Sequence, residues 1–219
     1  MKTFTLSLLL LIAFNATVCI AQKKEKYILP KGSWLFRFNP TGMIDPVETN
    51  FSVGGEYRFH SNWSVSADAA WIFYSSYFGA KHTNGFIFRP AIRYYIPHTD
   101  GMFVETELHY KYVSYRIEDW LGKNCVNGVP SYEEFTRFSY LKQAWGFHIK
   151  TGYQERIGRD KRFWMEAYLG IGPRWRSFKV KDEPNSCYTH AGDASLNIIN
   201  NNLSVAIPMG IRLMYTFKK

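Results

Sequence analysis

The sequence predicts an all-β protein: an eight-stranded antiparallel up-and-down transmembrane β-barrel with short periplasmic turns and longer extracellular loops. Three observations lead to this prediction. Eight segments alternate between apolar and polar residues with the period of two that a β-strand imposes. Aromatic residues make up 18% of the 219 residues although the mean hydropathy is only −0.26, which suits strands with one apolar and one polar face. The connections between the segments alternate between short and long.

Residues 1–21 carry the features of a secretory signal peptide: a positive residue near the start, an apolar core, and the small-x-small sequence Cys19-Ile20-Ala21. A lipoprotein anchor at Cys19 is the alternative, but the residues before it fit poorly where such an anchor needs small ones. No other apolar run reaches the roughly 18 residues of a membrane helix. We therefore expect export, a periplasmic N-terminal segment over residues 22–32, and an outer-membrane β-barrel over residues 33–219.

The predicted strands cover residues 34–42, 51–59, 63–74, 85–97, 102–117, 144–156, 163–178 and 203–217. In the last of these, every odd position from Leu203 to Phe217 is apolar or aromatic, while Ser204, Arg212 and Thr216 lie at even positions. The predicted turns are short at 60–62, 98–101 and 158–162, and the loops are longer at about 43–50, 75–84, 118–143 and 179–202. This alternation is typical of outer-membrane barrels.

Four prolines fall inside the predicted strands, namely Pro40, Pro90, Pro173 and Pro208. Proline cannot donate a backbone hydrogen bond, and a closed barrel has no free edge where the missing donor would be harmless. We therefore expect β-bulges or kinks at these positions.

The charged residues near mid-strand share one face of each segment, and we expect this face to point inward. A lipid-facing Arg or Lys near the bilayer midplane costs about 2–4 kcal/mol. Because an eight-stranded barrel is just wide enough for side chains to fill it, ion pairs and hydrogen bonds should plug the lumen. The predicted lumen network consists of Arg37, Glu56, Arg58, Asp68, Arg89, Arg93, Glu105, Glu107, His109, Lys111, His148, Lys150, Arg156, Glu166, Arg174, Arg176 and Arg212.

The opposite face is apolar and should contact lipid. Aromatic residues near the strand ends are expected to form girdles at the two membrane interfaces. The predicted outer girdle consists of Trp71, Phe73, Phe86, Tyr112, Trp145 and Trp175. A soluble β-sandwich or lipocalin-like barrel is the alternative fold, and it would bury the apolar face and expose the charged one.

Two cysteines remain beyond the predicted signal peptide, in a compartment that permits disulfides. Cys125 and Cys187 fall in the two longest predicted loops, so we expect a disulfide between these loops, with two separate thiols as the alternative. The aromatic residues around Phe138 are either part of the loop or an extension of the strands beyond the membrane.

Catalysis and metal binding have weak support in the sequence. His190, Asp193 and Ser195 cluster in the last loop and His82 lies in the second, but clustering alone does not establish a nucleophile and base. His109 and His148 lack the spacing of a metal site and are expected to join the charged network. We therefore expect neither an enzyme nor a cofactor nor a bound metal. Nucleic acid is not an expected partner, because the net charge of +9 forms no basic stripe.

Several runs carry a resemblance to a known group of proteins. They are Val53-Gly54-Gly55-Glu56-Tyr57-Arg58-Phe59, residues 63–67, Arg93-Tyr94-Tyr95 and residues 210–217. The mature chain resembles small outer-membrane β-barrel proteins of Gram-negative bacteria, of the OmpX/OmpA barrel type. The resemblance implies that the barrel-assembly machinery reads the C-terminal strand through Tyr215 and Phe217, although two lysines follow where that Phe is usually terminal.

The expected function follows from this combination. We expect a monomeric outer-membrane protein in contact with membrane lipid, with a structural or surface-binding (adhesion) role through its extracellular loops. Exposed aromatic loop residues suit an extracellular protein or a glycan as partner. An outer-membrane lipid-modifying enzyme and a narrow transporter are the alternatives.

Overall fold

The computed structural model describes residues 30–99, 101–158, 162–181, 183, 185–188 and 202–217. The predicted signal peptide, and His190, Asp193 and Ser195 of the last loop, lie outside these residues. In the described part no helix has the length and apolar character needed to cross a membrane. The helical elements described there are two short 3-10 helices, η2 (Pro40–Ile44) and η3 (Tyr77–Gly79).

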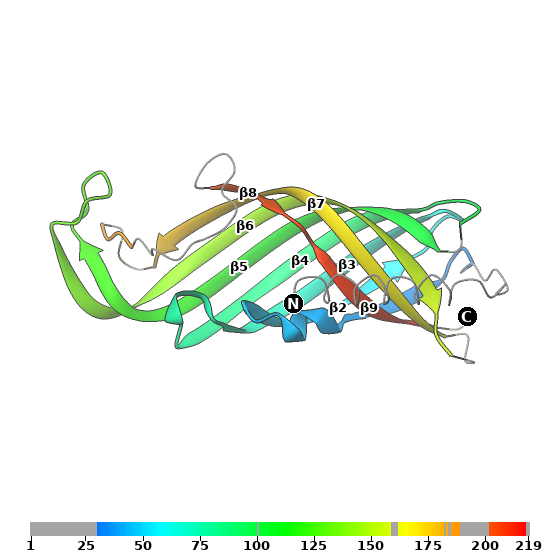
Figure 1. Cartoon of the computed structure of the whole chain (residues 1–219), viewed down its shortest axis with the longest axis horizontal. Helices are drawn as coiled ribbons and strands as arrows, with labels where there is room; N and C mark the ends of the chain where they lie inside the picture. Colours follow the sequence, from blue (N-terminus) through cyan, green and yellow to red (C-terminus); the bar gives the residue numbers. More distant parts are fainter. Residues whose placement is uncertain are drawn as a thin grey trace, which may run out of the picture.

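The described chain is an antiparallel β-sheet whose strand pairings close into a ring (Figure 1). The strands are β1 (Trp34–Asn39), β2 (Glu48–Tyr57), β3 (Trp63–Ser75), β4 (His82–Tyr95), β5 (Met102–Lys123), β6 (Tyr132–Arg156), β7 (Phe163–Val180), β8 (Leu203–Ala206) and β9 (Met209–Thr216). Consecutive strands pair from β1 to β7, and β7 then pairs with both β8 and β9. The ring is completed by β9 and β1, where Leu35 lies opposite Thr216 and Phe38 opposite Leu213.

The strands β8 and β9 occupy one position in the ring, where the sequence predicted one continuous strand. The same register against β7 holds on both sides of the break, because Gly172 lies opposite Ala206 and Leu169 opposite Met209. Pro208 lies in the break, and its carbonyl oxygen accepts a hydrogen bond from the Gly170 amide at 2.8 Å. The interruption therefore leaves the alignment of the two segments intact.

Bulges or kinks were predicted at the prolines, and the described pairings show no bulge at the two prolines that lie within strands. Pro90 lies within β4 and Pro173 within β7, and the registers of both strands run past them without a shift. Pro40 lies outside the sheet, because β1 ends at Asn39 and the proline begins η2, whose first turn the Asn39 side chain caps through the Thr41 amide at 3.1 Å. The register shift that the pairings contain lies between Thr49 and Asn50 in β2.

The predicted loop over residues 118–143 is also wrong, because most of it is paired strand. The β5–β6 register continues to the pair Lys123 and Tyr132, so the turn occupies only residues 124–131. This long hairpin projects at the left-hand end of Figure 1, whereas the C-terminal end of β9 and the short turns lie at the right-hand end. The aromatic residues around Phe138 therefore extend the strands.

The polarity of the two sheet faces reverses along these strands. From Met102 to Tyr112 the outward side chains of β5 are mostly apolar and the inward ones from Glu105 onward are charged. Beyond Tyr112 the inward residues Val113, Tyr115, Ile117 and Leu121 of β5 are apolar, whereas Ser114, Arg116 and Glu118 face outward. The inward residues of the outer half form a hydrophobic cluster of Ala70, Ile72, Ile87, Val113, Tyr115, Ile117, Leu121 and Phe138.

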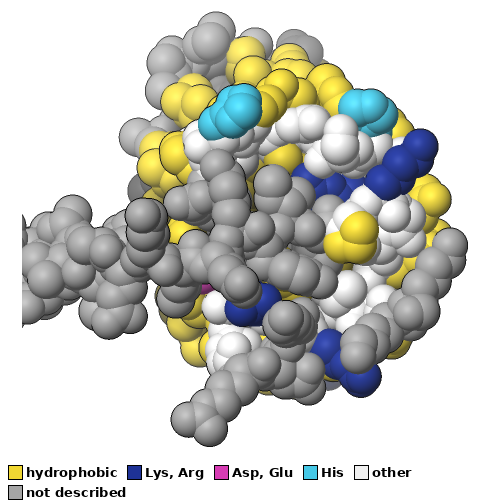
Figure 2. All heavy atoms as spheres, turned by 90° about the vertical axis from the view of Figure 1, so that its right-hand side faces the viewer, with side chains coloured by type: hydrophobic (Ala, Val, Ile, Leu, Met, Phe, Trp, Pro, Cys, Tyr) yellow, Lys and Arg dark blue, Asp and Glu magenta, His cyan; other side chains and the backbone are white. Residues whose placement is uncertain are grey.

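Viewed from the end that carries the short turns, hydrophobic side chains occupy much of the visible outline of the molecule (Figure 2). Exposed large apolar residues continue around the ring on every strand from β1 to β7, with representatives such as Phe36, Trp71, Leu108 and Ile171. Charged residues such as Arg37, Glu105 and Arg212 instead lie buried in the interior. The described ring therefore has an apolar outside and an ionic inside over its inner half.

Candidate functional site

The candidate site is the charged interior of the ring. Apart from Arg58, which directly follows β2, the residues predicted as a lumen network lie at inward positions of β1 to β7 and β9, because alternate residues of each strand face the same side. Arg89, Arg156 and Arg174 are partly buried, and the other predicted members are buried. The structure thus buries or partly buries all of the predicted members.

The most tightly connected part is an ionic layer centred on Glu105 and Glu166. Arg93 reaches both carboxylates, with Nε 2.9 Å from Glu105 Oε2 and Nη1 2.6 Å from Glu166 Oε2. Arg212 also reaches both, with Nη1 2.6 Å from Glu166 Oε1 and 3.3 Å from Glu105 Oε1. Two guanidinium groups and two carboxylates from four different strands therefore bridge the interior.

Neighbouring groups enlarge this layer. Arg37 Nη2 lies 3.2 Å from Asp68 Oδ2 and 3.7 Å from Glu105 Oε2. Aromatic rings cover the guanidinium groups, with Phe103 3.8 Å from Arg93 and Tyr168 4.1 Å from Arg212. Because the ions in the layer have partners of opposite charge, the layer is a salt-bridge network that spans the interior of the ring.

A second charged group lies inside the ring, nearer to the end that carries the β5–β6 hairpin. It surrounds Glu48, a residue that the prediction placed in a loop. The Glu48 carboxylate accepts hydrogen bonds from Lys111, Tyr115 and Lys142, the last at 3.1 Å. Lys142 was missed as well, because residues 118–143 were predicted to be a loop. Both residues lie in segments whose alternating pattern continues past the point where the outward-facing residues become polar. This continued alternation is the sequence signal that would have identified them.

Glu107, His109 and His148 lie between these two groups. His148 Nδ1 is 3.2 Å from Glu107 Oε1, the two imidazole centroids are 5.3 Å apart, and one potential ligand atom from each residue lies within 4.8 Å of the others. Two imidazoles and a carboxylate can bind a transition metal. However, Lys150 donates a hydrogen bond to the same Glu107 carboxylate, so one of its oxygen atoms is already engaged.

The outer hairpin is fastened to the chain after β7. Cys125 and Cys187 form a disulfide with their Cα atoms 6.0 Å apart, and the Cys187 amide donates to the Gly122 carbonyl at 3.0 Å. Tyr188 donates to Asp119 Oδ2 at 2.8 Å. Partial burial and this hydrogen bond raise the pKa of Tyr188 above its usual value. The disulfide therefore joins the two predicted loops within a wider set of contacts.

The remaining sequence candidates lie apart from the charged interior. Tyr215 packs against Phe163, with ring centroids 5.2 Å apart, and Phe217 is exposed at the end of the described chain. His82 is exposed at the start of β4. Of the four loop residues that were considered as possible catalytic groups, it is the one that the described part contains.

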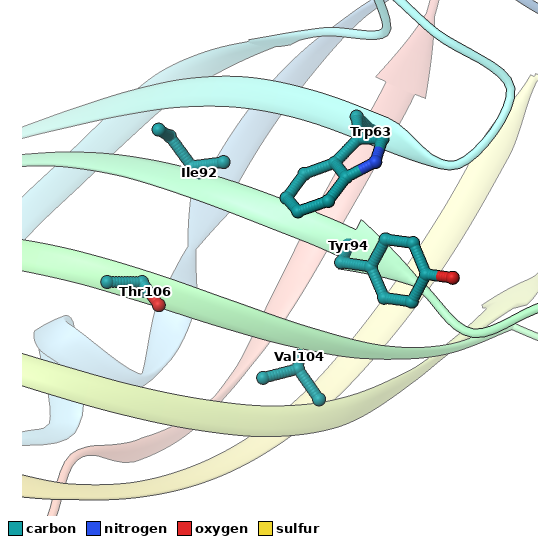
Figure 3. A pocket seen from close by; sticks show the side chains of 5 residues that line it. All are labelled: Trp63, Ile92, Tyr94, Val104 and Thr106. Atoms are coloured by element: carbon teal, nitrogen blue, oxygen red, sulfur yellow. The ribbon is translucent and has the colours of Figure 1, made fainter.

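The outer surface holds a shallow groove of about 390 Å³ between β3, β4 and β5. Figure 3 shows the side chains that line it, which are Trp63, Ile92, Tyr94, Val104 and Thr106. Trp63 and Tyr94 pack with ring centroids 4.8 Å apart. Among the lining residues, Thr106 and Tyr94 are the two that carry a hydroxyl group. The groove therefore suits binding of an apolar ligand better than catalysis.

Comparison with known proteins identifies a family without assigning an activity. Residues 41–217 match the family described as protein of unknown function (DUF3575), which covers the ring from η2 to the end of β9. The chain has no significant match among curated proteins or solved structures. The family found is not a named OmpX or OmpA family, so the expected resemblance is supported only at the level of an antiparallel all-β ring. Because the match covers most of the sequence, the chain belongs to the DUF3575 family.

Proposed function

We propose that this chain is an exported outer-membrane β-barrel with a closed, charged interior, which acts at the cell surface as a structural or adhesive binding protein. In this proposal residues 1–21 are a signal peptide, the short turns face the periplasm, and the long β5–β6 hairpin faces the outside. The barrel-assembly machinery would read the strand that carries Tyr215 and Phe217.

The reversal of polarity along the strands is the observation that supports membrane insertion. In water, a ring with charged residues inside and apolar residues outside would expose its apolar surface at a high free-energy cost. In lipid, the same arrangement is favourable because the outward side chains meet hydrocarbon. The reversal beyond Tyr112 suits a strand that leaves the membrane there and continues in water.

The dimensions of the apolar belt agree with this proposal. On β5 the belt runs over residues 102–112, and a tilted strand needs about 9–11 residues to cross the hydrocarbon. Tyr112, Trp145 and Trp175 mark its outer limit on three adjacent strands, and the next outward residues on β6 and β7 are Gln143 and Ser177. Aromatic residues at such a limit suit the membrane interface.

The tip of the hairpin supports a binding role. Trp120 and Phe135 are exposed beyond the belt and lie with ring centroids 5.7 Å apart. Val126, Val129 and Tyr132 are exposed around the turn, which the disulfide fastens. Exposed aromatic side chains on a braced hairpin suit contact with a protein or glycan at little cost in conformational entropy. The ion pairs inside the ring favour this role over transport.

The membrane proposal can be tested with cysteines on the outward face of β5. Leu108→Cys lies within the proposed belt, and Arg116→Cys lies beyond it on the same face of the same strand. We expect a membrane-impermeant maleimide to label Arg116→Cys on intact cells and to leave Leu108→Cys unlabelled until the membrane is dissolved and the protein unfolded. The native cysteines do not interfere while they remain in the disulfide.

A ring that stands in water would give a different result. Both side chains are exposed on the isolated ring, so equal labelling of folded Leu108→Cys and Arg116→Cys would contradict membrane insertion. Cell fractionation of each variant provides the control, because a misassembled variant would be lost from the membrane fraction.

The surface-binding role needs a separate measurement. We expect the purified protein to bind a subset of an array of glycans and extracellular matrix proteins, and the double variant Trp120→Ser/Phe135→Ser to lose that binding. Tyr74→Ser removes an exposed aromatic side chain from the outer end of β3 and is the matched control. Binding that survives the double variant would remove the hairpin tip as the binding surface, and no binding by the wild type would leave the structural role.

A further inference from the structure

An unpaired strand edge lies next to the junction that completes the ring. There β9 pairs with β1 only through Leu213 to Thr216, because β1 ends at Asn39 and Pro40 begins η2. The described pairings join β8 to β7 alone, so the other side of β8 has no neighbouring strand among the described residues. Figure 1 shows β8 apart from η2, which follows β1 in the chain.

The register between β7 and β8 determines which backbone groups of this edge are free. The Arg176 amide donates to the Asn202 carbonyl at 2.7 Å, and the Gly170 amide donates to the Pro208 carbonyl at 2.8 Å. In an antiparallel pair every second residue makes such bonds with the neighbouring strand. The even positions from 202 to 208 therefore face β7. The missing donor of Pro208 lies on that side and does not interrupt the free edge.

The odd positions Leu203, Val205 and Ile207 direct their backbone N–H and C=O groups away from β7. In the described part of the chain no hydrogen bond joins these groups to another residue. The side chains of the three residues are partly or fully exposed, whereas those of Ser204 and Ala206 are buried. The free edge therefore combines unpaired backbone groups with an outward row of apolar side chains.

This edge lies within the proposed apolar belt. Leu203 is opposite Trp175, which marks the outer limit of the belt, and Val205 is opposite Pro173, farther inside. Hydrocarbon chains cannot hydrogen-bond, so an open strand edge at this depth needs another strand to pair its backbone groups. This requirement rests on the proposed membrane insertion, because in water the free groups would bond solvent.

We propose that a second copy of this chain pairs with the free edge of β8. A partner at this depth must have an unpaired strand edge of its own, and a fully closed barrel has none. A second copy has the same edge at the same depth. Antiparallel pairing about a two-fold axis at Val205 places Leu203 of one copy opposite Ile207 of the other, which also brings the apolar rows into contact. The membrane form is then a dimer, in contrast to the monomer expected from the sequence.

The proposal can be tested by light scattering on the full chain, extracted from membranes in a mild detergent and separated by size. We expect the wild type to be a dimer. Val205→Pro removes an amide that faces the second copy and leaves the bonds to β7 in place, so the mass should fall to that of the monomer. Val205→Ala keeps the amide at the same position and should remain a dimer.

A cross-linking measurement in native membranes does not depend on the proline variant. We expect copper phenanthroline to oxidise Val205→Cys to a disulfide-linked dimer, seen on a boiled, non-reducing gel. Leu108→Cys is the matched control, because it lies on the outward face of β5 within the same belt and should stay monomeric. Heat-dependent gel mobility and recovery in the membrane fraction establish that each variant is assembled.

The outcomes separate the dimer from membrane insertion. A wild-type monomer in the membrane fraction, without cross-linking of Val205→Cys, would overturn the dimer and leave insertion intact. An assembled Val205→Pro variant that stays dimeric would overturn pairing through this edge, as would equal cross-linking of Leu108→Cys. Linkage of Val205→Cys to a different protein would also contradict a second copy as the partner. Recovery of the protein in the soluble fraction would contradict the insertion on which the pairing depends.

Discussion

Glu105 is the side chain on which the ionic layer depends most. It is fully buried and lies within 4 Å of cationic nitrogen atoms from Arg37, Arg93, Lys150 and Arg212. Removal of one partner from a buried ionic network leaves the remaining charges without compensation, which costs more than the network itself contributes. The Glu105 carboxylate therefore serves four cations at once.

This position gives a prediction for a conservative substitution. Glu105→Gln keeps the size of the side chain and removes its charge, so we expect the free energy of unfolding to fall by about 3–5 kcal/mol. Glu118→Gln is the matched control, because Glu118 pairs with Arg137 at 3.4 Å on the exposed face of the same strand. Such a surface pair contributes about 0–1 kcal/mol. Urea unfolding measures both, and equal effects would show that burial does not govern the network.

The sequence predicted the orientation of individual side chains better than their contacts. Alternation along each strand predicted that residues such as Arg93 and Arg212 point inward, and burial agrees with that orientation. It could not predict that these two arginines share Glu166 from a third strand, because such contacts depend on the stagger of the strands around the ring. Glu48 and Lys142 escaped notice for a different reason, since both lie where the outward face is no longer apolar.

The hairpin of β5 and β6 extends well beyond the apolar belt, and the disulfide fastens its tip. Cys125 and Cys187 are 62 residues apart in sequence, and closing a loop of that length in the unfolded chain gives an upper limit of about 4 kcal/mol of stabilisation. The paired strands already hold most of the intervening chain in place. The disulfide should therefore act mainly on the turn and on the chain after β7.

We accordingly predict a local effect when both cysteines are replaced by serine. The turn over residues 124–131 contains no Lys or Arg, so trypsin has no cleavage site within it. We expect trypsin to cleave next to Lys123 and Lys181 faster in the variant than in the wild type. Mass spectrometry of the fragments measures it. Faster cleavage at Arg156 near the opposite end of β6 would instead indicate that the disulfide stabilises the whole ring.

The prolines show why a rule about single residues can fail for an element. Pro90 lacks a backbone donor, yet β4 continues through it with the same register on its β3 side. At Pro208 the strand is interrupted, but the carbonyl of the proline still accepts a hydrogen bond from β7. The sequence identified where donors are missing, whereas the partner strands determine whether alignment survives.

The described part of the chain is an antiparallel ring whose strand order the sequence predicted. The predicted alternation of long and short connections is not seen between β3, β4 and β5, because the connections over residues 76–81 and 96–101 have the same length. The membrane-spanning belt is also a prediction from the sequence, and it stays a proposal. The sequence did not predict how far β5 and β6 continue beyond Tyr112. There the inward residues of β5 become apolar and most of its outward residues polar, as in a protein surrounded by water. A search for a single apolar face along each strand does not detect such a change of polarity.

The proposed barrel can be tested by its mobility on an SDS gel. If the proposed barrel is correct, we expect the protein from membranes to migrate faster on an SDS gel when unheated than after boiling, because a closed ring keeps its backbone hydrogen bonds and stays compact. Reduction of the disulfide before loading is the control for compaction by that bond alone. Identical mobility, together with recovery in the soluble fraction, would contradict the barrel.

The junction of β1 and β9 has a consequence for the order in which the molecule forms. The hairpins from β2 to β7 join neighbours in sequence, whereas the pair Leu35 and Thr216 joins the two ends of the described chain. Contacts between distant residues carry the largest loop-closure entropy and form slowly. An open sheet with two unpaired edges should therefore precede the ring, and those edges invite pairing with other chains. The last few residues of β9 thus decide whether a folding intermediate closes on itself or aggregates.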